Sequence, residues 1–382
     1  MTGSRRWTRS AFSLLETMPD AVVVVDAAGR VAYANQLIEQ VFGYSPDALV
    51  GRSIEVLVPE KARRQHERQR AEYTRAPAVR SMGTMSQVHG LHMSGRKFPA
   101  DISLSPIESE EGLLVIAAVR DMTDHRRVEA ALRKANEKLD RDLTTAAKIQ
   151  KSLLPGRPAG IPGVDVEWIF EPCETLGGDS FNAFEITDGL IGFYLLDVAG
   201  HGTVAALHSV ALTRVLASSW TVEGRSSPAQ LTKWLNSEFP YDPEIGQYFT
   251  FLCGTLDRST GTLRYACAGH PCPIHVPDGG RPVALGCAGL PVGLFADADF
   301  DEAEVEFGVG DRLYLYSDGV TETMNEKHED FGIAGLMESL TKTRGSTLGE
   351  TVQELRRAVG RWRDPKEPED DLTLLALELA PT

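Results

Sequence analysis

The stretch from Asp124 to Leu154 contains neither glycine nor proline, and it constrains the fold more than any other feature of the sequence. We expect one long polar helix there, because the two strongest helix breakers are missing. Prolines at positions 155, 158 and 162 end the pattern. The helix therefore divides the chain into a domain over residues 10–123, a linker over residues 124–154 and a domain over residues 155–382.

Apolar residues recur along this helix at heptad spacing, which favours a parallel coiled coil between two chains over a single amphipathic helix on its own domain. Asp142 interrupts the seam near its middle and weakens it. The seam consists of Leu132, Leu139, Ala146 and Leu153, with Val128, Ala135 and Ile149 at the intervening positions. We therefore expect the linker to hold a homodimer together.

Residues 10–123 read as short strands separated by polar turns. The run AVVVVD at Ala21–Asp26 and the following VAYAN predict a hairpin, and Ser45-Pro46 predicts the start of a helix. Alternating apolar residues from Phe98 to Leu104 indicate a half-buried strand, and Leu113–Val119 reads as the last strand.

This segment resembles a PAS domain in the hairpin ending at Asn35, in FGYSPDALVGRS, in GRKFPADISLSPI and in RDMTD at Arg120–Asp124. The resemblance implies a small sensor module with one antiparallel sheet and flanking helices. It leaves the ligand unknown. His66 in RRQHERQRAEY lies where haem-binding PAS sensors carry their proximal histidine, but Ser86 falls near the position of their distal arginine. For His66 we therefore favour an exposed helix histidine over a haem ligand.

Acidic residues stand at the ends of predicted strands in residues 155–382. Asp179 follows Gly177-Gly178, Asp197 ends LIGFYLLD, Asp318 ends RLYLYSD, and Asp370-Asp371 opens the final strand. Carboxylates brought together at the rim of a sheet repel one another, and divalent cations such as Mg²⁺ or Mn²⁺ remove that cost. A turn or a helix cap explains any one of these aspartates, but it explains all of them together less well.

The same half resembles PP2C-type phosphatases of the SpoIIE kind, the bacterial branch that controls sigma factors. The resemblance rests on AAKIQKSLLP, LGGDSFN, LLDVAGHGTVAALHSVAL, LRYACAGHPCPI, GLPVGL, LYLYSDGVTETMN and EDDLTLLAL, in family order. It implies a four-layer α/β/β/α sandwich with two Mn²⁺ or Mg²⁺ ions in its cleft. The whole chain would then be an α+β protein made of a PAS sensor, a helical linker and this sandwich.

The resemblance also implies roles for individual positions. Asp197 would bridge both metals, and the Val198 carbonyl would add an oxygen. Asp179 would serve one metal, Asp318 and Asp370 would serve the other, and Asp371 is the weaker candidate of the last pair. Asn182 replaces an aspartate that the family often carries, and we assign that position no metal.

These patterns predict a sensor-regulated, metal-dependent protein serine/threonine phosphatase. The resemblance names its substrate as a phosphorylated anti-sigma factor antagonist, in a stress or developmental response. The alternative is a catalytically silent pseudo-phosphatase that acts as a PAS-regulated binding module. Residues 151–382 carry 17 Lys and Arg against 35 Asp and Glu, which argues against nucleic acid and anionic membranes as partners.

Other features of the sequence bear on location and on rival sites. An odd cysteine count without a secretory signal leads us to expect reduced thiols and a cytoplasmic protein. The run from Gly177 to Phe181 resembles the diguanylate cyclase signature, but Ser180 stands where that family needs glutamate. Cys267, His270 and Cys272 lack zinc-finger spacing, and we favour a structural role for them. His201 lies in the expected metal-binding turn and is left outside the catalytic set.

Overall fold

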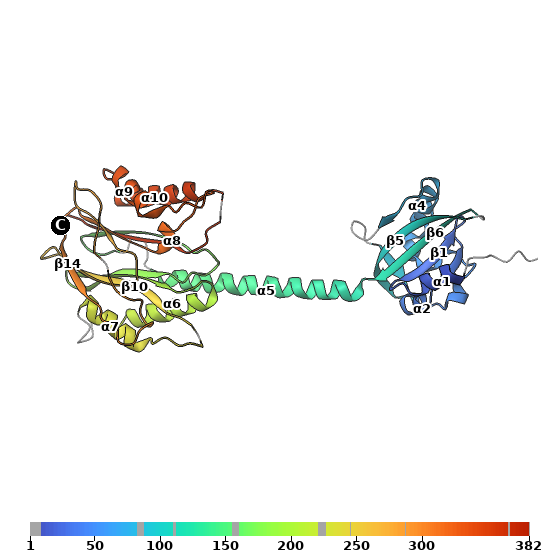
Figure 1. Cartoon of the computed structure of the whole chain (residues 1–382), viewed down its shortest axis with the longest axis horizontal. Coiled ribbons are helices and arrows are strands. Elements are labelled where there is room, and N and C mark those ends of the chain that lie inside the picture. Colours follow the sequence, from blue (N-terminus) through green and yellow to red (C-terminus); the bar gives the residue numbers. More distant parts are fainter. Residues whose placement is uncertain are drawn as a thin grey trace, which may run out of the picture. The chain divides into compact units, whose positions relative to one another are not determined.

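The computed structural model describes residues 9–81, 88–109, 112–154, 160–220, 227–244, 246–286, 288–365 and 367–381. The chain divides into two compact units, Met1–Lys138 and Leu139–Thr382 (Figure 1). The long helix α5 spans Thr123–Leu153, so it begins in the first unit and ends in the second. Among the described residues, none of the helices combines the length and the apolar character that crossing a bilayer requires.

The first unit is built on one antiparallel sheet in the order β2-β1-β6-β5-β3, with β4 paired to β5. Its strands are β1 (Ala21–Asp26), β2 (Val31–Ala34), β3 (Arg80–Ser81), β4 (His89–Leu91), β5 (Lys97–Ser109) and β6 (Gly112–Asp121). The helices are α1 (Arg9–Glu16), α2 (Leu37–Phe42), α3 (Pro46–Leu49) and α4 (Arg63–Arg75), with the 3₁₀ turns η1 (Ile54–Leu57) and η2 (Glu60–Ala62). A core of valines, alanines and aromatic residues lies between the sheet and these helices.

Asn35 fixes the end of the first hairpin. Its fully buried side chain accepts a hydrogen bond from the Val22 amide at 2.8 Å and donates to the carbonyls of Asp20 and Leu15 at 3.0 and 3.2 Å. A buried amide needs all of these partners, which accounts for an asparagine at this position.

His66 has a partner that the sequence did not indicate. Its Nδ1 lies 2.8 and 2.9 Å from the two carboxylate oxygens of the buried Glu55 on η1. His66 and Arg70 also line a cavity of about 70 Å³ between α4 and the sheet. The expectation of an exposed helix histidine is therefore wrong: the side chain is half-buried, because α4 packs against η1.

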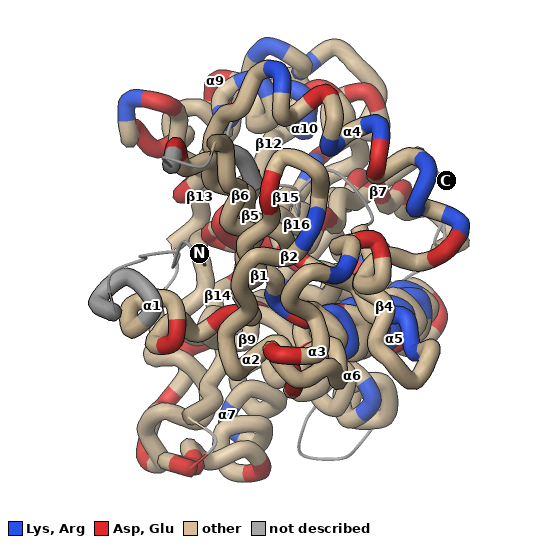
Figure 2. Tube along the Cα trace, turned by 90° about the vertical axis from the view of Figure 1, so that its right-hand side faces the viewer, with Lys and Arg blue, Asp and Glu red and all other residues tan. Residues whose placement is uncertain are grey.

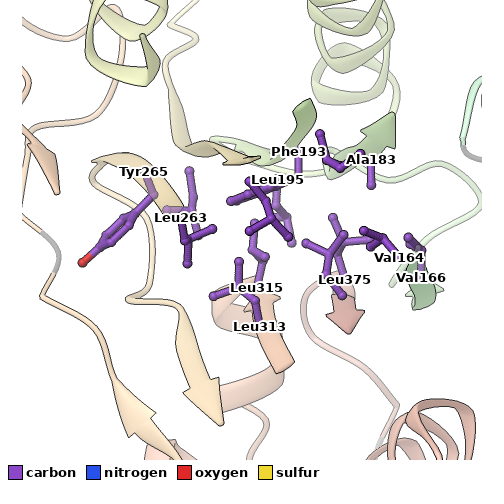
Figure 3. Close-up of a cluster of buried hydrophobic side chains, with 14 of the residues drawn as sticks. Val164, Val166, Ala183, Phe193, Leu195, Leu263, Tyr265, Leu313, Leu315 and Leu375 are labelled. Atoms are coloured by element: carbon purple, nitrogen blue, oxygen red, sulfur yellow. The ribbon is translucent and has the colours of Figure 1, made fainter. Parts of the chain in front are cut away.

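The second unit is a sandwich of two five-stranded antiparallel sheets in the orders β14-β11-β10-β9-β8 and β13-β12-β15-β16-β7. The first contains β8 (Ser180–Thr187), β9 (Leu190–Val198), β10 (Phe249–Asp257), β11 (Thr262–Ala268) and β14 (Glu302–Glu306). The second contains β7 (Val164–Glu171), β12 (Ile274–Val276), β13 (Val283–Ala284), β15 (Arg312–Tyr316) and β16 (Leu372–Leu379). Side chains such as Leu195 and Leu315 point from the two sheets into a shared core (Figure 3).

Helices cover both outer faces of the sandwich, which makes the four layers expected from the sequence (Figure 1). Helices α6 (Thr203–Leu216) and α7 (Pro228–Glu238) pack on the first sheet. Helices α8 (Asp318–Thr321), α9 (Gly332–Lys342) and α10 (Leu348–Arg363) lie on the side of the second sheet. Each helix buries an apolar stripe against its sheet, and that burial is the main source of stability here.

Two observations concern residues singled out from the sequence. Cys267 is disulfide-bonded, while Cys173, Cys253 and Cys272 are free thiols. The expectation of reduced thiols throughout is therefore wrong for Cys267. On α5, the apolar positions Val128, Leu132, Leu139 and Ile149 are 58–68% exposed.

Candidate metal centre

The sandwich brings the strand-end aspartates together at one edge. β8 and β9 are antiparallel neighbours in which Ser180 pairs with Leu196, so Asp179 and Asp197 stand side by side at the same end of the first sheet. β15 and β16 are likewise neighbours in which Tyr316 pairs with Leu374, so Asp318 and the pair Asp370-Asp371 meet at one end of the second sheet. Because the sheets stack face to face, the two ends adjoin and the carboxylates sense one another's charge.

The cluster is largely withdrawn from solvent and short of compensating charge: Asp179 and Asp371 are buried, Asp197 and Asp318 are half-buried, and Asp370 is exposed. Burial first, and then the charges of Asp197 and Asp371, hold the pKa of Asp179 well above its usual range. Burial and the nearby Asp318, Asp370 and Asp371 raise the pKa of Asp197 to about 8. Burial with Asp370 and Glu322 raises the pKa of Asp318 to about 6, and burial is also the main cause that raises the pKa of Asp370. The chain therefore stores electrostatic repulsion at this edge.

The surroundings of Asp179 indicate that a bound cation would relieve this repulsion. The side chain of Asp179 is 1% exposed; the hydroxyls of Ser317 and Thr373 lie near it, but neither carboxylate oxygen forms a hydrogen bond of good geometry with a described residue. A buried carboxylate without a partner is costly and calls for a cation. An all-oxygen donor set fits Mg²⁺ or Mn²⁺, so the residues present are suited to the metals expected from the sequence.

Asp371 has a different arrangement from its neighbour Asp370. One oxygen accepts hydrogen bonds from the backbone amides of Gly178 and Asp179 at 2.6 and 3.4 Å, and the other accepts from the Cys173 amide at 2.8 Å. This carboxylate is thus occupied in holding the segment that leads into Asp179. The geometry favours Asp370 over Asp371 as a metal ligand, in keeping with the weaker candidacy given to Asp371.

Cys173 also lies beside these aspartates. Ligand atoms of Cys173, Asp370 and Asp371 lie within 4.8 Å of one another. Burial and the charge of Asp371 raise the pKa of the Cys173 thiol to about 12, so the thiol remains protonated at neutral pH. The sequence analysis did not single out this residue, because a cysteine six positions before Asp179 has no distinctive spacing.

Gln150 is a second residue that sequence reasoning missed, although it belongs to the quoted run AAKIQKSLLP. It is 5% exposed on an otherwise solvent-facing helix. Its Nε2 donates to the Gly177 carbonyl at 2.6 Å, and its Oε1 accepts from the Gly177 amide at 3.3 Å. Through Gln150, the end of α5 therefore holds the backbone of Gly177, two residues before Asp179, by two hydrogen bonds. A Cβ on Gly177 would stand 2.6 Å from an Asp371 oxygen, which explains the glycine.

Two histidines lie near the centre without joining it. His201 is exposed, and its Nδ1 lies 2.6 Å from a Glu174 oxygen. His270 is buried, its Nδ1 lies 2.7 Å from the Thr250 hydroxyl, and burial lowers its pKa to about 3. Thr250 pairs across the strands with Asp197, so His270 supports the strand beside the centre, as expected of a structural residue.

Comparisons with known proteins agree with this division of the chain. Residues 187–380 match the family model described as stage II sporulation protein E (SpoIIE), and residues 12–122 match the PAS fold. Phosphoserine phosphatase RsbP of Bacillus subtilis is 29% identical over 211 residues, which cover 52% of this chain and 52% of RsbP. Phosphoserine phosphatase RsbU of the same organism is 24% identical over 247 residues, which cover 64% of this chain and 72% of RsbU. The chain thus spans about half the length of RsbP.

A solved structure resembles the sandwich as well. The SiaA-PP2C domain of Pseudomonas aeruginosa superposes with a TM-score of 0.58 at 22% identity, over 64% of this chain and 98% of that domain. At this level of identity the likeness concerns the fold alone.

Proposed function

This chain belongs to the stage II sporulation protein E (SpoIIE) family and carries a PAS domain ahead of the matched region, and on that premise we propose that it is a metal-dependent protein serine/threonine phosphatase regulated by its PAS unit. The observation that carries the proposal is the unpartnered, buried carboxylate of Asp179 within the cluster of aspartates. The names of the relatives RsbP and RsbU, both phosphoserine phosphatases, support the choice of substrate bond.

The proposed reaction is hydrolysis of a phosphoserine or phosphothreonine ester. The oxygen of a water bonds to phosphorus, the bond from phosphorus to the side-chain oxygen breaks, and the hydroxyl leaves with a proton. Bound Mn²⁺ or Mg²⁺ would supply positive charge to the phosphoryl oxygens and would make that water more acidic. The aspartates of this chain hold that charge in a fixed place before the substrate arrives.

We assign the metal-holding residues as the sequence predicted. Asp197 would contribute to both ions, with the Val198 carbonyl beside it. Asp179 would help to hold one ion, and Asp318 and Asp370 would help to hold the other. Asp371 and Gln150 position the ligands and do not bind metal themselves, because their hydrogen bonds fix the backbone around Gly177 and Gly178.

For the protein substrate we propose a phosphorylated anti-sigma factor antagonist, in a stress or developmental response. The test is Mn²⁺-dependent phosphate release from phosphorylated antagonists of the host by the full-length protein, with unrelated phosphoproteins as controls. Robust release from another phosphoprotein and none from any antagonist would refute this substrate. Absence of any metal-dependent release, including from an aryl phosphate, would favour the pseudo-phosphatase alternative.

We further propose that residues 10–123 form the sensor, that residues 124–154 form a coiled-coil linker in a homodimer, and that residues 155–382 form the catalytic domain. The exposed apolar positions of α5 support pairing with a second copy, since a solvated helix has little reason to carry them. The contact between Gln150 and Gly177 supports a route from the helix to the centre. The oligomeric state of a Leu132→Glu, Leu139→Glu variant in solution tests the pairing.

A further inference from the structure

A pocket of about 170 Å³ opens beside Asp370, where α8 faces the segment that follows α10. Asp370 belongs both to this pocket and to the aspartate cluster, so the pocket adjoins the candidate metal centre. Its charged lining residues are acidic apart from one arginine, and the rest of the lining is neutral. The residues that matter here are Gly319, Glu322, Arg363, Glu367, Glu369 and Asp370.

Arg363 differs from the other arginines of α10, a helix that carries both acidic and basic residues (Figure 2). Arg356 forms an ion pair with Glu171, and Arg357 and Arg361 approach Glu354 at 3.4 and 2.7 Å. The half-buried Arg363 makes no ion pair or hydrogen bond with any residue that the structure describes, although three glutamates line the same pocket. A half-buried guanidinium without a partner keeps its five N–H donors available for a ligand.

The position of Arg363 is nevertheless fixed. The preceding residue, Trp362, donates its indole N–H to the Glu329 carbonyl at 3.0 Å and packs edge-on against Phe331, with ring centroids 6.0 Å apart. These contacts pin the last turn of α10 to the loop before α9. The backbone of Arg363 is therefore held at the pocket, which limits the positions that its guanidinium can take.

The charge of the pocket indicates which ligand needs that cation. A phosphoryl group carries close to two negative charges, and in this pocket it would be repelled by Glu322, Glu367 and Glu369. A planar guanidinium binds phosphoryl oxygens through two parallel hydrogen bonds and offsets this repulsion. The four carboxylates would attract a cation, but a cationic or neutral ligand would leave the guanidinium of Arg363 unpaired, whereas an anionic one would pair with it.

We propose, on the basis of the proposed function, that Arg363 binds the phosphoryl oxygens of the substrate from the pocket that it lines together with Asp370. Arg363 is then a substrate-binding residue, and its loss weakens binding of any phosphoryl ligand. The size and identity of the rest of the substrate do not alter that effect.

The test measures binding of inorganic phosphate to the full-length, Mn²⁺-loaded protein by calorimetry, for the wild type, Arg363→Ala, Arg363→Lys and Arg361→Ala. Arg361 is the matched control: it is a basic residue in the same last turn, and it is already paired with Glu354. We expect the dissociation constant to rise about ten- to hundredfold in Arg363→Ala, less in Arg363→Lys, and less than twofold in Arg361→Ala. Thermal unfolding and Mn²⁺ binding should be the same for all four proteins.

A second measurement separates this proposal from the proposed function. If the wild type hydrolyses an aryl phosphate, Arg363→Ala should raise KM for that small substrate by the same factor as for a phosphoprotein. An unchanged phosphate affinity in Arg363→Ala, or a raised KM for the phosphoprotein alone, overturns the proposal. If the wild type binds phosphate through Arg363 yet hydrolyses nothing, the phosphatase assignment fails while the binding site stands.

Discussion

Replacing Asp197 with asparagine should stabilise the metal-free protein while it destroys metal-dependent function. The carboxylate is buried beside other aspartates, and its pKa lies near 8 instead of near 3.8. Because the folded pKa is raised, the folded and unfolded states are equally protonated below about pH 4, and stability falls as the pH rises from about 4 to about 8. At pH 7 this group alone costs at most about 4 kcal/mol of folding free energy, and asparagine removes most of that cost.

The assay is urea denaturation of the wild type and Asp197→Asn, with a chelator present, at pH 4.5 and pH 8. Tryptophan fluorescence reports mainly on the second unit, since four of the five tryptophans, at positions 168, 220, 234 and 362, lie there. The two proteins should unfold at nearly the same urea concentration at pH 4.5, and the variant should be the more stable at pH 8. Saturating Mn²⁺ should stabilise the wild type and should have little effect on the variant.

Activity completes this test. Loss of the bridging carboxylate should lower the rate of phosphate release by several orders of magnitude, because the metal charge supplies most of the transition-state stabilisation. A variant that is less stable than the wild type at pH 8 without metal would show that the repulsion argument is wrong. A variant with full activity at saturating Mn²⁺ would show that the site assignment is wrong.

Further perturbations test the remaining assignments. Asp179→Ala, Asp318→Ala and Asp370→Ala should each raise the Mn²⁺ concentration for half-maximal activity at least tenfold, whereas Asn182→Ala should leave it within about twofold, as measured by metal titration of phosphate release. Gln150→Ala should raise the same concentration several-fold because it frees the Gly177 backbone, whereas the exposed Ile149→Ala should not; equal behaviour of the two would refute a positioning role. Inserting one to four residues near Asp142 should change activity periodically, since each residue rotates the helix by about 100°, and a seven-residue insertion should restore it; indifference to every insertion would make α5 a passive spacer.

Local sequence patterns were sufficient to predict a structural feature wherever its physical cause lies in neighbouring residues. The strand-end aspartates could be located because buried apolar runs that end in Asp place the carboxylate at a sheet edge, and the structure brings Asp179, Asp197, Asp318 and Asp370 into one cluster. The long helix could be located because α5 contains no helix breaker. Family motifs then gave the fold, because they occur in order along most of the second unit.

The family resemblance ranked Asp371 below Asp370, but the sequence offered no physical reason to choose between them. They are adjacent at the start of one strand, so their side chains point to opposite sides, and only the packing partners decide which one is free. In the structure, a carboxylate oxygen of Asp371 accepts a hydrogen bond from the amide of Gly178, which lies 193 positions away along the chain.

The sequence by itself therefore determined the two domains, the connecting helix and the residue types of the candidate metal centre, since each depends on the pattern of neighbouring residues. Tertiary structure decided how Gln150 reaches Gly177, that Glu55 holds His66, and that Arg363 keeps no partner beside the aspartates. The reason is that hydrogen bonds and ion pairs between distant segments depend on side-chain positions within a few tenths of an ångström, and only the packed sandwich and the packed sensor sheet fix those positions.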